Sequence, residues 1–546
     1  MTKFAKVLLI ATPLLFAGPA LAEEDRDKAV SQDDLLNILE GGPVEDALFQ
    51  ERQELTVSLR KELGKTTPEQ NIFLSFMDQN QFEKALYQWW PAFEKKPFLK
   101  SATGQAVYAY LLFKNGLELN GLQALMMIKE PKKIHPDVVK LWRLLTPAGH
   151  EAWGLIDVAW NDDWTAVFDV ATEVQVRARQ MYDPSNTDKV FELLRKTKLK
   201  TKERAWLEWQ MALGLSLQGE LAKAAKVLSH LMKDETGLIS HDVQNITAAR
   251  LLYQQGYLAP AIGYYQKINK KSEYWFTAQE EMAWSYIRKG EPQNTLAVTQ
   301  TLMHKDFAPH VGPEVVFLRA LASLKVCDYP AVVSSINSYR ERFKERAKIM
   351  VSLSEAGQSE DVDKLLLALR KGRVKLLSLG SSAGRIPRYV SRDEVLLGQV
   401  QRQVKLETEA KTAGELYARS LTGGSDQVGF QARIEELRFD AESRLQAAKS
   451  AIYGRIKDLA NEEVQEIHNI LQKMHIVEAE LIQQIAQAER VVRASTKEVT
   501  EKKGSTGSRD KYSLKFPFEG ETWFDELANY RVDIKKGCQA MRGGEK

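Results

Sequence analysis

Cysteine, net charge and long apolar runs are all scarce in this chain of 546 residues. Two cysteines, Cys327 and Cys538, are too few for a disulfide framework and cannot by themselves form a structural zinc site. The formal charge is only +3, which argues against a general nucleic-acid or anionic-membrane binder. Beyond the N-terminus, no stretch reaches the roughly 18 apolar residues of a membrane-spanning helix. We therefore expect a soluble globular protein, peripheral to a membrane at most.

Motifs of common enzyme classes are also scarce. The phosphate-binding loop and the Rossmann fingerprint do not occur. Residues 380–384 match the G-x-S-x-G pattern, but Pro387 obstructs the helix that must follow a nucleophile elbow. His468 and His475 are two helical turns apart, too far to bind one metal ion together. We therefore predict a protein that is not an enzyme, with no catalytic residue, no metal site and no cofactor.

The N-terminal residues have the pattern of a cleaved secretory signal. Lys3 and Lys6 precede a short apolar run, and Ala20-Leu21-Ala22 supplies the small residues that signal peptidase recognises. The run is too short to span a bilayer, which argues against a membrane anchor. We predict cleavage after Ala22 and export of the remaining chain.

An internal repeat is the most informative pattern in the rest of the sequence. A turn residue recurs, at spacings of 37, 34 and 37 residues, at Gly219, Gly256, Gly290 and Cys327. Seven positions before each turn residue stands an alanine, which lets two helices approach closely: Ala212, Ala249, Ala283 and Ala320. Looser copies of the pattern surround Asn80, Gly116 and Asn161. The spacing predicts consecutive helical hairpins, and an ordinary helical bundle is the alternative.

These repeats resemble the tetratricopeptide repeat, a helix–turn–helix unit of about 34 residues. The resemblance covers residues 67–345, with an irregular helix pair expected at about 170–200. It implies an all-α fold in which stacked hairpins form a solenoid whose first helices line a concave groove. The expected groove residues are Tyr110, Phe113, Arg250, Tyr253, Trp284, Arg288 and Lys325. Their cationic and aromatic groups suit an acidic peptide or a terminal carboxylate, unless many of them pack between repeats.

After residue 392 the chain changes to long, charged helices. In residues 393–497, apolar side chains recur at steps of three and four, the seam of a coiled coil. Residues 423–426 divide this region into a shorter and a longer arm. Three arrangements are open: the shorter arm folds back antiparallel, the longer arm pairs with another chain, or a curved amphipathic helix packs on the solenoid.

The C-terminal residues form a polar linker followed by an aromatic and acidic tail. The candidate contact residues of this tail are Phe518, Trp523, Phe524, Asp525, Glu526 and Tyr530. The tail is too short to build its own core, so we expect it either to dock on the protein or to bind a partner. Cys538 lies in the same tail, and the sequence leaves open whether it forms a disulfide with Cys327.

Together these features predict six segments along the chain. They are a signal peptide (1–22), a leader with a helical segment (23–66), the solenoid (67–345), a helical connector and loop (346–392), the coiled-coil arm (393–497), and the linker with its tail (498–546). The combination is similar to periplasmic tetratricopeptide proteins, some of them gliding-motility-like, that accompany ExbB/ExbD/TonB-type motors. That resemblance implies a periplasmic scaffold whose partners are proteins such as these envelope components. Nucleic-acid partners are not expected, because the net charge is close to zero. The alternatives are a structural protein that forms homo-oligomers through its coiled coil and, less favoured, a cell-wall enzyme with repeats.

Overall fold

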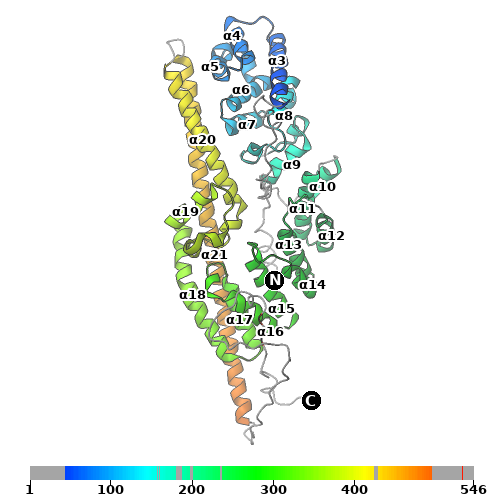
Figure 1. The fold of residues 1–546 in the computed structure, drawn as a ribbon, viewed down its shortest axis with the longest axis vertical. Coiled ribbons are helices and arrows are strands. Elements are labelled where there is room, and N and C mark those ends of the chain that lie inside the picture. The colour runs from blue at the N-terminus through cyan, green and yellow to red at the C-terminus, as the bar shows by residue number, and fades with distance from the viewer. Residues whose placement is uncertain are drawn as a thin grey trace, which may run out of the picture. The chain divides into compact units, whose positions relative to one another are not determined.

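The computed structural model describes residues 43–156, 158, 160–179, 187–196, 201–233, 236–422, 428–494, 530 and 532. All regular structure within these ranges is helical and none of it is strand, which confirms the predicted all-α fold (Figure 1). No helix in these ranges is long and apolar enough to cross a membrane. The predicted signal peptide and most of the C-terminal tail lie outside the described residues.

The chain forms two compact units. Unit 1 is built from Met1–Ser240, Leu366–Arg373 and Arg392–Arg455, and unit 2 from His241–Leu365, Val374–Ser391 and Ile456–Lys546. The helices α19 (Glu360–Leu369) and α21 (Val428–Ala494) contribute residues to both units.

Unit 1 contains helices of moderate length and the longer α20. They are α3 (Pro43–Leu63), α4 (Pro68–Asp78), α5 (Phe82–Phe93), α6 (Ala102–Lys114), α7 (Glu118–Met126), α8 (Pro136–Leu145), α9 (Val170–Arg179), α10 (Thr187–Lys196), α11 (Thr201–Leu217), α12 (Leu221–Leu231) and α20 (Glu394–Thr422). Unit 2 contains α13 (His241–Gln254), α14 (Leu258–Gln266), α15 (Trp275–Lys289), α16 (Pro292–Leu302), α17 (Pro313–Lys325) and α18 (Tyr329–Ala356). Short 3₁₀ helices connect several of them: η2 (Pro97–Lys100), η3 (Pro131–Lys133), η4 (Glu151–Gly154), η5 (Asp162–Ala166), η6 (Lys305–Phe307), η7 (Leu376–Arg385) and η8 (Val390–Arg392).

Neighbouring helices pair as hairpins, and each hairpin turn contains one residue in the left-handed conformation. The pairs are α4 with α5, α6 with α7 and α11 with α12 in unit 1, and α13 with α14, α15 with α16 and α17 with α18 in unit 2. The turn residues have φ between 59° and 85°, and they are Asn80, Gly116, Gly219, Gly256, Gly290 and Cys327. A positive φ ends the first helix of each pair, and glycine or asparagine tolerates it best. In unit 2 each hairpin also packs on the next, because α14 contacts α15 and α16 contacts α17.

Small residues lie where the two helices of a hairpin come closest. The alanines of the repeat pattern in both units are at most 1% exposed: Ala109, Ala212, Ala249, Ala283 and Ala320. A Cβ atom on Gly121 of α7 would lie only 2.7 Å from the Ala109 carbonyl oxygen of α6. At the matching position of the α15–α16 hairpin, the Thr295 hydroxyl donates to the Ala283 carbonyl oxygen at 3.1 Å. A polar residue is tolerated in this contact because its hydroxyl is hydrogen-bonded.

The expected hairpin turn at Asn161 is wrong. Asn161 has φ −94° and caps η5, where its side chain accepts a hydrogen bond from the Asp163 backbone N–H. The surrounding residues form the 3₁₀ helices η4 and η5, and the fully buried indoles of Trp153 and Trp164 fill the space. Phe168 packs against both rings, edge-on to Trp153 at 4.9 Å and stacked on Trp164 at 5.9 Å. Bulky aromatic packing therefore replaces a hairpin here, and α9 and α10 follow where an irregular helix pair was expected.

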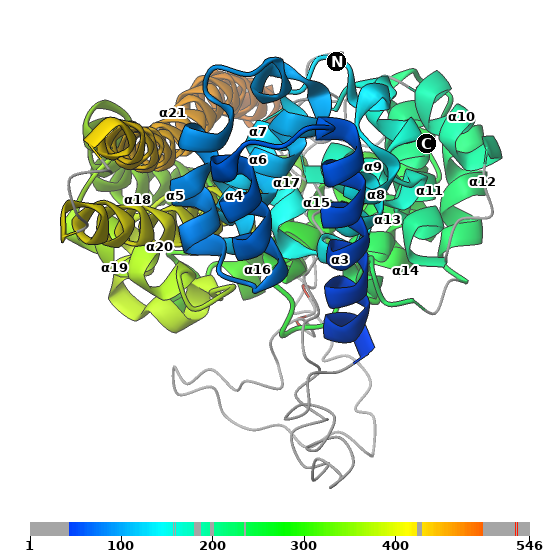
Figure 2. The same cartoon turned by 90° about the horizontal axis from the view of Figure 1, so that it is seen from above.

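The two arms pack on hairpins of the same chain. In unit 1, α20 and the first part of α21 run antiparallel: Gln431 donates to the Ser420 carbonyl oxygen at 3.0 Å, and Arg455 pairs with Asp393 at 2.6 Å (Figure 1; Figure 2). Their apolar side chains join the core of the N-terminal hairpins. In unit 2, the rest of α21 packs on α17 and α18, and the Tyr339 hydroxyl donates to the Ile467 carbonyl oxygen at 2.7 Å. The shorter arm thus folds back as an antiparallel partner.

Candidate functional site

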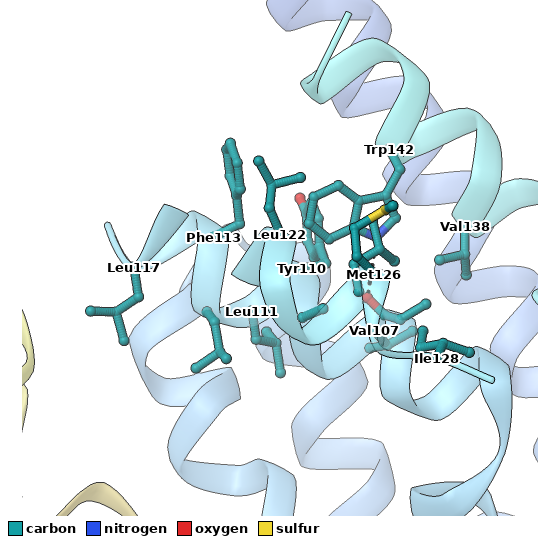
Figure 3. Packing of buried hydrophobic residues seen from close by; sticks show 14 of the residues in the cluster. Val107, Tyr110, Leu111, Phe113, Leu117, Leu122, Met126, Ile128, Val138 and Trp142 are labelled. Atoms are coloured by element: carbon teal, nitrogen blue, oxygen red, sulfur yellow. Dashed lines mark hydrogen bonds between the residues drawn. The ribbon is translucent and has the colours of Figure 1, made fainter. Parts of the chain in front are cut away.

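Two of the predicted groove residues, Tyr110 and Phe113, lie in the core of unit 1. Tyr110 is 1% exposed and Phe113 is 7% exposed. Both rings meet the Trp142 ring edge-on, with centroids 6.4 and 5.6 Å away (Figure 3). Because α5, α7 and α8 all pack on α6, this helix has little free surface. The prediction that these two residues line an open groove is therefore wrong.

Arg250 and Trp284 connect successive hairpins of unit 2. Arg250 of α13 forms a bidentate ion pair with Glu281 of α15, with a shortest distance of 2.7 Å. The Trp284 indole nitrogen of α15 donates to Glu314 of α17 at 2.9 Å. Burial opposes the charge of Arg250, but the Glu281 carboxylate raises its pKa above the usual value. These two predicted groove residues thus link neighbouring hairpins. This agrees with the alternative that groove residues pack between repeats.

Tyr253 and Arg288 form a more accessible pair. The Arg288 guanidinium carbon lies 5.0 Å from the centre of the Tyr253 ring, and its Nη1 donates to the Tyr253 carbonyl oxygen at 2.7 Å. Arg288 is exposed and Tyr253 is half-buried. Tyr257 follows directly after the turn and is 58% exposed. We call this pair, together with Tyr257 four positions after Tyr253 in the chain, the Tyr–Arg patch. Tyrosine and arginine are enriched in binding hot spots.

The remaining predicted contact residues lie near or beyond the end of α17. Lys325 is exposed in the last turn of this helix. Cys327 is disulfide-bonded, while Cys538, the other cysteine of the chain, lies outside the described residues, so their pairing stays a prediction. Of the tail residues, Tyr530 is half-buried. The other tail residues named above lie outside the described ranges: Phe518, Trp523, Phe524, Asp525 and Glu526.

A hollow that sequence reasoning missed lies in unit 1 between α5, α6 and α21. Its volume is about 390 Å³. Trp89, Trp90 and Tyr108 line it. The Tyr108 ring stacks on Trp89 at 5.9 Å and meets Trp90 edge-on at 5.7 Å. We call this the aromatic hollow, and Leu99 and Leu437 extend its apolar wall.

Charged side chains of α21 form the rim of the aromatic hollow. Arg433 is shared between Glu436 at 2.9 Å and Glu94 at 3.4 Å. Asp440 pairs with Arg444 at 2.8 Å. Burial raises the pKa of the Tyr108 hydroxyl, and Asp440 and Glu436 add to this effect against Arg433. Tyr108 therefore stays neutral, and its hydroxyl makes no hydrogen bond to the part of the chain that the structure describes.

The hollow could not be predicted from the sequence because its two sides are remote in the chain. Glu94 and Arg433, whose ion pair joins the two sides, are 339 residues apart. The adjacent pair Trp89-Trp90 is the sequence feature that could have indicated the hollow. The apolar face of α5 needs an indole at only one of two adjacent positions.

No group of three or more histidine, cysteine, aspartate or glutamate side chains in the described ranges could hold a metal ion. Comparison with protein-family models found no match for this chain, and comparison with curated proteins found none either.

Proposed function

We propose that this protein is an exported, non-enzymatic scaffold that binds other polypeptides through its helical hairpins. The observation that carries the proposal is the Tyr–Arg patch. Arg288 is held over the Tyr253 ring by its hydrogen bond to the Tyr253 carbonyl oxygen. A guanidinium that is already oriented loses little conformational freedom when it binds. The patch offers an acidic or C-terminal peptide a charge-assisted hydrogen bond from Arg288 and the exposed ring of Tyr257.

The packing of α21 supports an adaptor more than a self-assembling structural protein. Ile467, Ile470 and Met474 lie on the apolar seam of α21 and are at most 6% exposed within unit 2. An apolar seam that is covered by the same chain is not available for a coiled coil with another copy. We expect the purified mature chain to sediment as a monomer, and a concentration-dependent dimer would favour the structural protein instead.

The resemblance to periplasmic tetratricopeptide proteins directs the search for partners. We propose that they include ExbB/ExbD/TonB-like components of an envelope energy-transduction or transport system. The exposed cation of the patch suits an acidic segment or a terminal carboxylate of such a partner. The proposed periplasmic location follows from the predicted signal peptide.

Charge reversal in the patch tests the proposed function. We expect Arg288→Glu combined with Tyr257→Ser to lower capture of a partner identified by mass spectrometry at least tenfold, because both changes remove exposed contact groups. Circular dichroism should show unchanged helicity. Lys267→Glu is the matched control, since Lys267 caps the end of α14, in the hairpin that carries Tyr257, and lies 4.4 Å from the centre of the Tyr264 ring. Equal capture by the wild type and the patch variant would refute the proposal.

A further inference from the structure

We propose that the aromatic hollow of unit 1 binds an arginine side chain of a partner polypeptide. This site shares no residue with the Tyr–Arg patch and goes beyond the function proposed from it. The occupant is inferred from three properties of the hollow: its aromatic lining, the surplus of carboxylates over guanidinium groups at its rim, and its size.

The aromatic lining favours a flat cation. Trp90 and Tyr108 both retain some exposed surface, with Trp90 at 9%. The electron-rich face of an indole or phenol ring attracts a cation, and the planar guanidinium of arginine stacks on such a face in addition. Leu99 and Leu437 provide apolar wall on which the three methylene groups of arginine can pack.

The rim carries twice as many carboxylates as guanidinium groups. Its ionised groups are the carboxylates of Glu436 and Asp440 and the guanidinium of Arg433. Glu436 is 65% exposed and Asp440 is 48% exposed, so each keeps oxygen lone pairs open to a guest while paired with its arginine. The guanidinium of Arg433 is already divided between Glu436 and Glu94. A guest that only donates hydrogen bonds, as arginine does with five N–H groups, complements this rim.

Other guests fit the same lining less well. An anion would face two carboxylates at the rim, and a neutral aromatic group would make no hydrogen bond to their remaining acceptor oxygens. The volume of about 390 Å³ exceeds that of one side chain, which leaves room for the adjoining backbone of a peptide. The Tyr108 hydroxyl, neutral at physiological pH, can accept a hydrogen bond from the guanidinium or from that backbone.

Fluorine NMR of the full chain labelled with 5-fluorotryptophan tests this site directly. Trp90→Phe assigns the Trp90 signal, and the probes are butylguanidinium, its neutral counterpart butylurea, and the peptide acetyl-Ala-Arg-Ala-amide. We expect butylguanidinium to shift the Trp90 signal saturably, and butylurea to bind at least tenfold more weakly. The peptide should bind more tightly than butylguanidinium because it also fills the rest of the hollow.

Variants of the rim separate charge recognition from apolar binding. Glu436→Gln with Asp440→Asn should weaken butylguanidinium binding at least fivefold and leave butylurea binding unchanged. Glu435→Gln, on the same helix but outside the lining, is the matched control and should change neither. Equal binding of butylguanidinium and butylurea, or no saturable shift with either, would overturn the arginine site. Equal affinity for butylguanidinium and the peptide would overturn its assignment to a polypeptide. None of these outcomes affects the Tyr–Arg patch.

Discussion

Replacing Arg388 by methionine is expected to lower the free energy of unfolding of unit 2 by about 3–5 kcal/mol. The Arg388 side chain is 6% exposed, and its guanidinium donates to Glu466 at 2.6 Å and lies 3.6 Å from Glu280. Its backbone N–H donates to Glu463 at 2.9 Å. The guanidinium thus compensates acidic groups from α15 and α21 in a buried cluster. Without it, these carboxylates lose the charge that offsets their desolvation.

The same variant should change the pH dependence of stability. Burial raises the pKa of Glu280 and of Glu466, and Arg388 opposes this effect at both. Without Arg388 both pKa values should rise further, so the folded variant binds protons that the unfolded chain releases. Stability contributed by such groups is lost as pH rises through their folded pKa. The loss caused by the substitution should therefore be smaller at pH 5 than at pH 8.

Arg340→Met is the matched control for this prediction. Arg340 joins α18 to α21 through a 2.8 Å pair with Glu478, but its side chain is 48% exposed. Exposed ion pairs contribute about 1 kcal/mol or less, so this variant should unfold close to the wild type. Urea unfolding, monitored by hydrogen exchange of residues 456–487, measures the free energy of unfolding of both variants. Equal losses for the two would contradict a structural role of the buried cluster.

Glu409 is expected to make unit 1 less stable as pH rises through about 7. Its carboxylate, from α20, accepts the backbone N–H groups of Leu119 at 2.5 Å and Asn120 at 3.3 Å. Leu117, the N-cap residue of α7, supplies no side-chain cap, so Glu409 takes over this role from a distant helix. Burial raises the pKa of Glu409 to about 7, although the two N–H groups oppose this effect.

The sign follows from the raised folded pKa of Glu409. Its contribution to stability is complete below the unfolded value of 4.5 and is lost as pH rises through about 7. The span between these two values corresponds to about 3 kcal/mol. We expect Glu409→Gln, which keeps a neutral acceptor, to remove this part of the pH dependence between pH 5 and 8.

Glu407→Gln serves as the control for Glu409. Its carboxylate pairs with Arg370, and this hydrogen bond lowers the pKa of Glu407. A group with a lowered pKa loses its contribution only as pH falls through its folded value, so Glu407 should not titrate between pH 5 and 8. Urea unfolding at both pH values provides the measurement. Identical pH dependence of the wild type and Glu409→Gln would show that Glu409 does not titrate in this range.

The hairpins could be predicted because their requirements are local in sequence. A left-handed turn residue favours glycine or asparagine, and the close helix contact favours alanine seven positions earlier. The spacing of Gly219, Gly256 and Gly290 therefore indicates where the hairpin turns lie. The predicted turn at Asn161 is wrong because asparagine also caps helices. Asn161 caps a short 3₁₀ helix here, and the nearby tryptophans pack around it.

The binding surfaces could not be predicted because they depend on contacts between distant residues. Tyr110 satisfies the groove template, but α8 covers α6 and buries it. Trp284 occupies a groove position, yet its indole bonds to Glu314 of the next hairpin. The aromatic hollow requires α21 to pack beside α5, and this pairing depends on which apolar stripe of the long helix faces which hairpin.

Site-specific photo-crosslinking at position 257 in intact cells tests most directly whether the hairpin surface binds another polypeptide. With p-benzoylphenylalanine in place of Tyr257, we predict a covalent adduct with one defined polypeptide, lost when Arg288 is replaced by glutamate. The same probe at Val351, which is 42% exposed on α18, should give no such adduct. Absence of an adduct at position 257, or the same adduct at both positions, would contradict the proposed scaffold function.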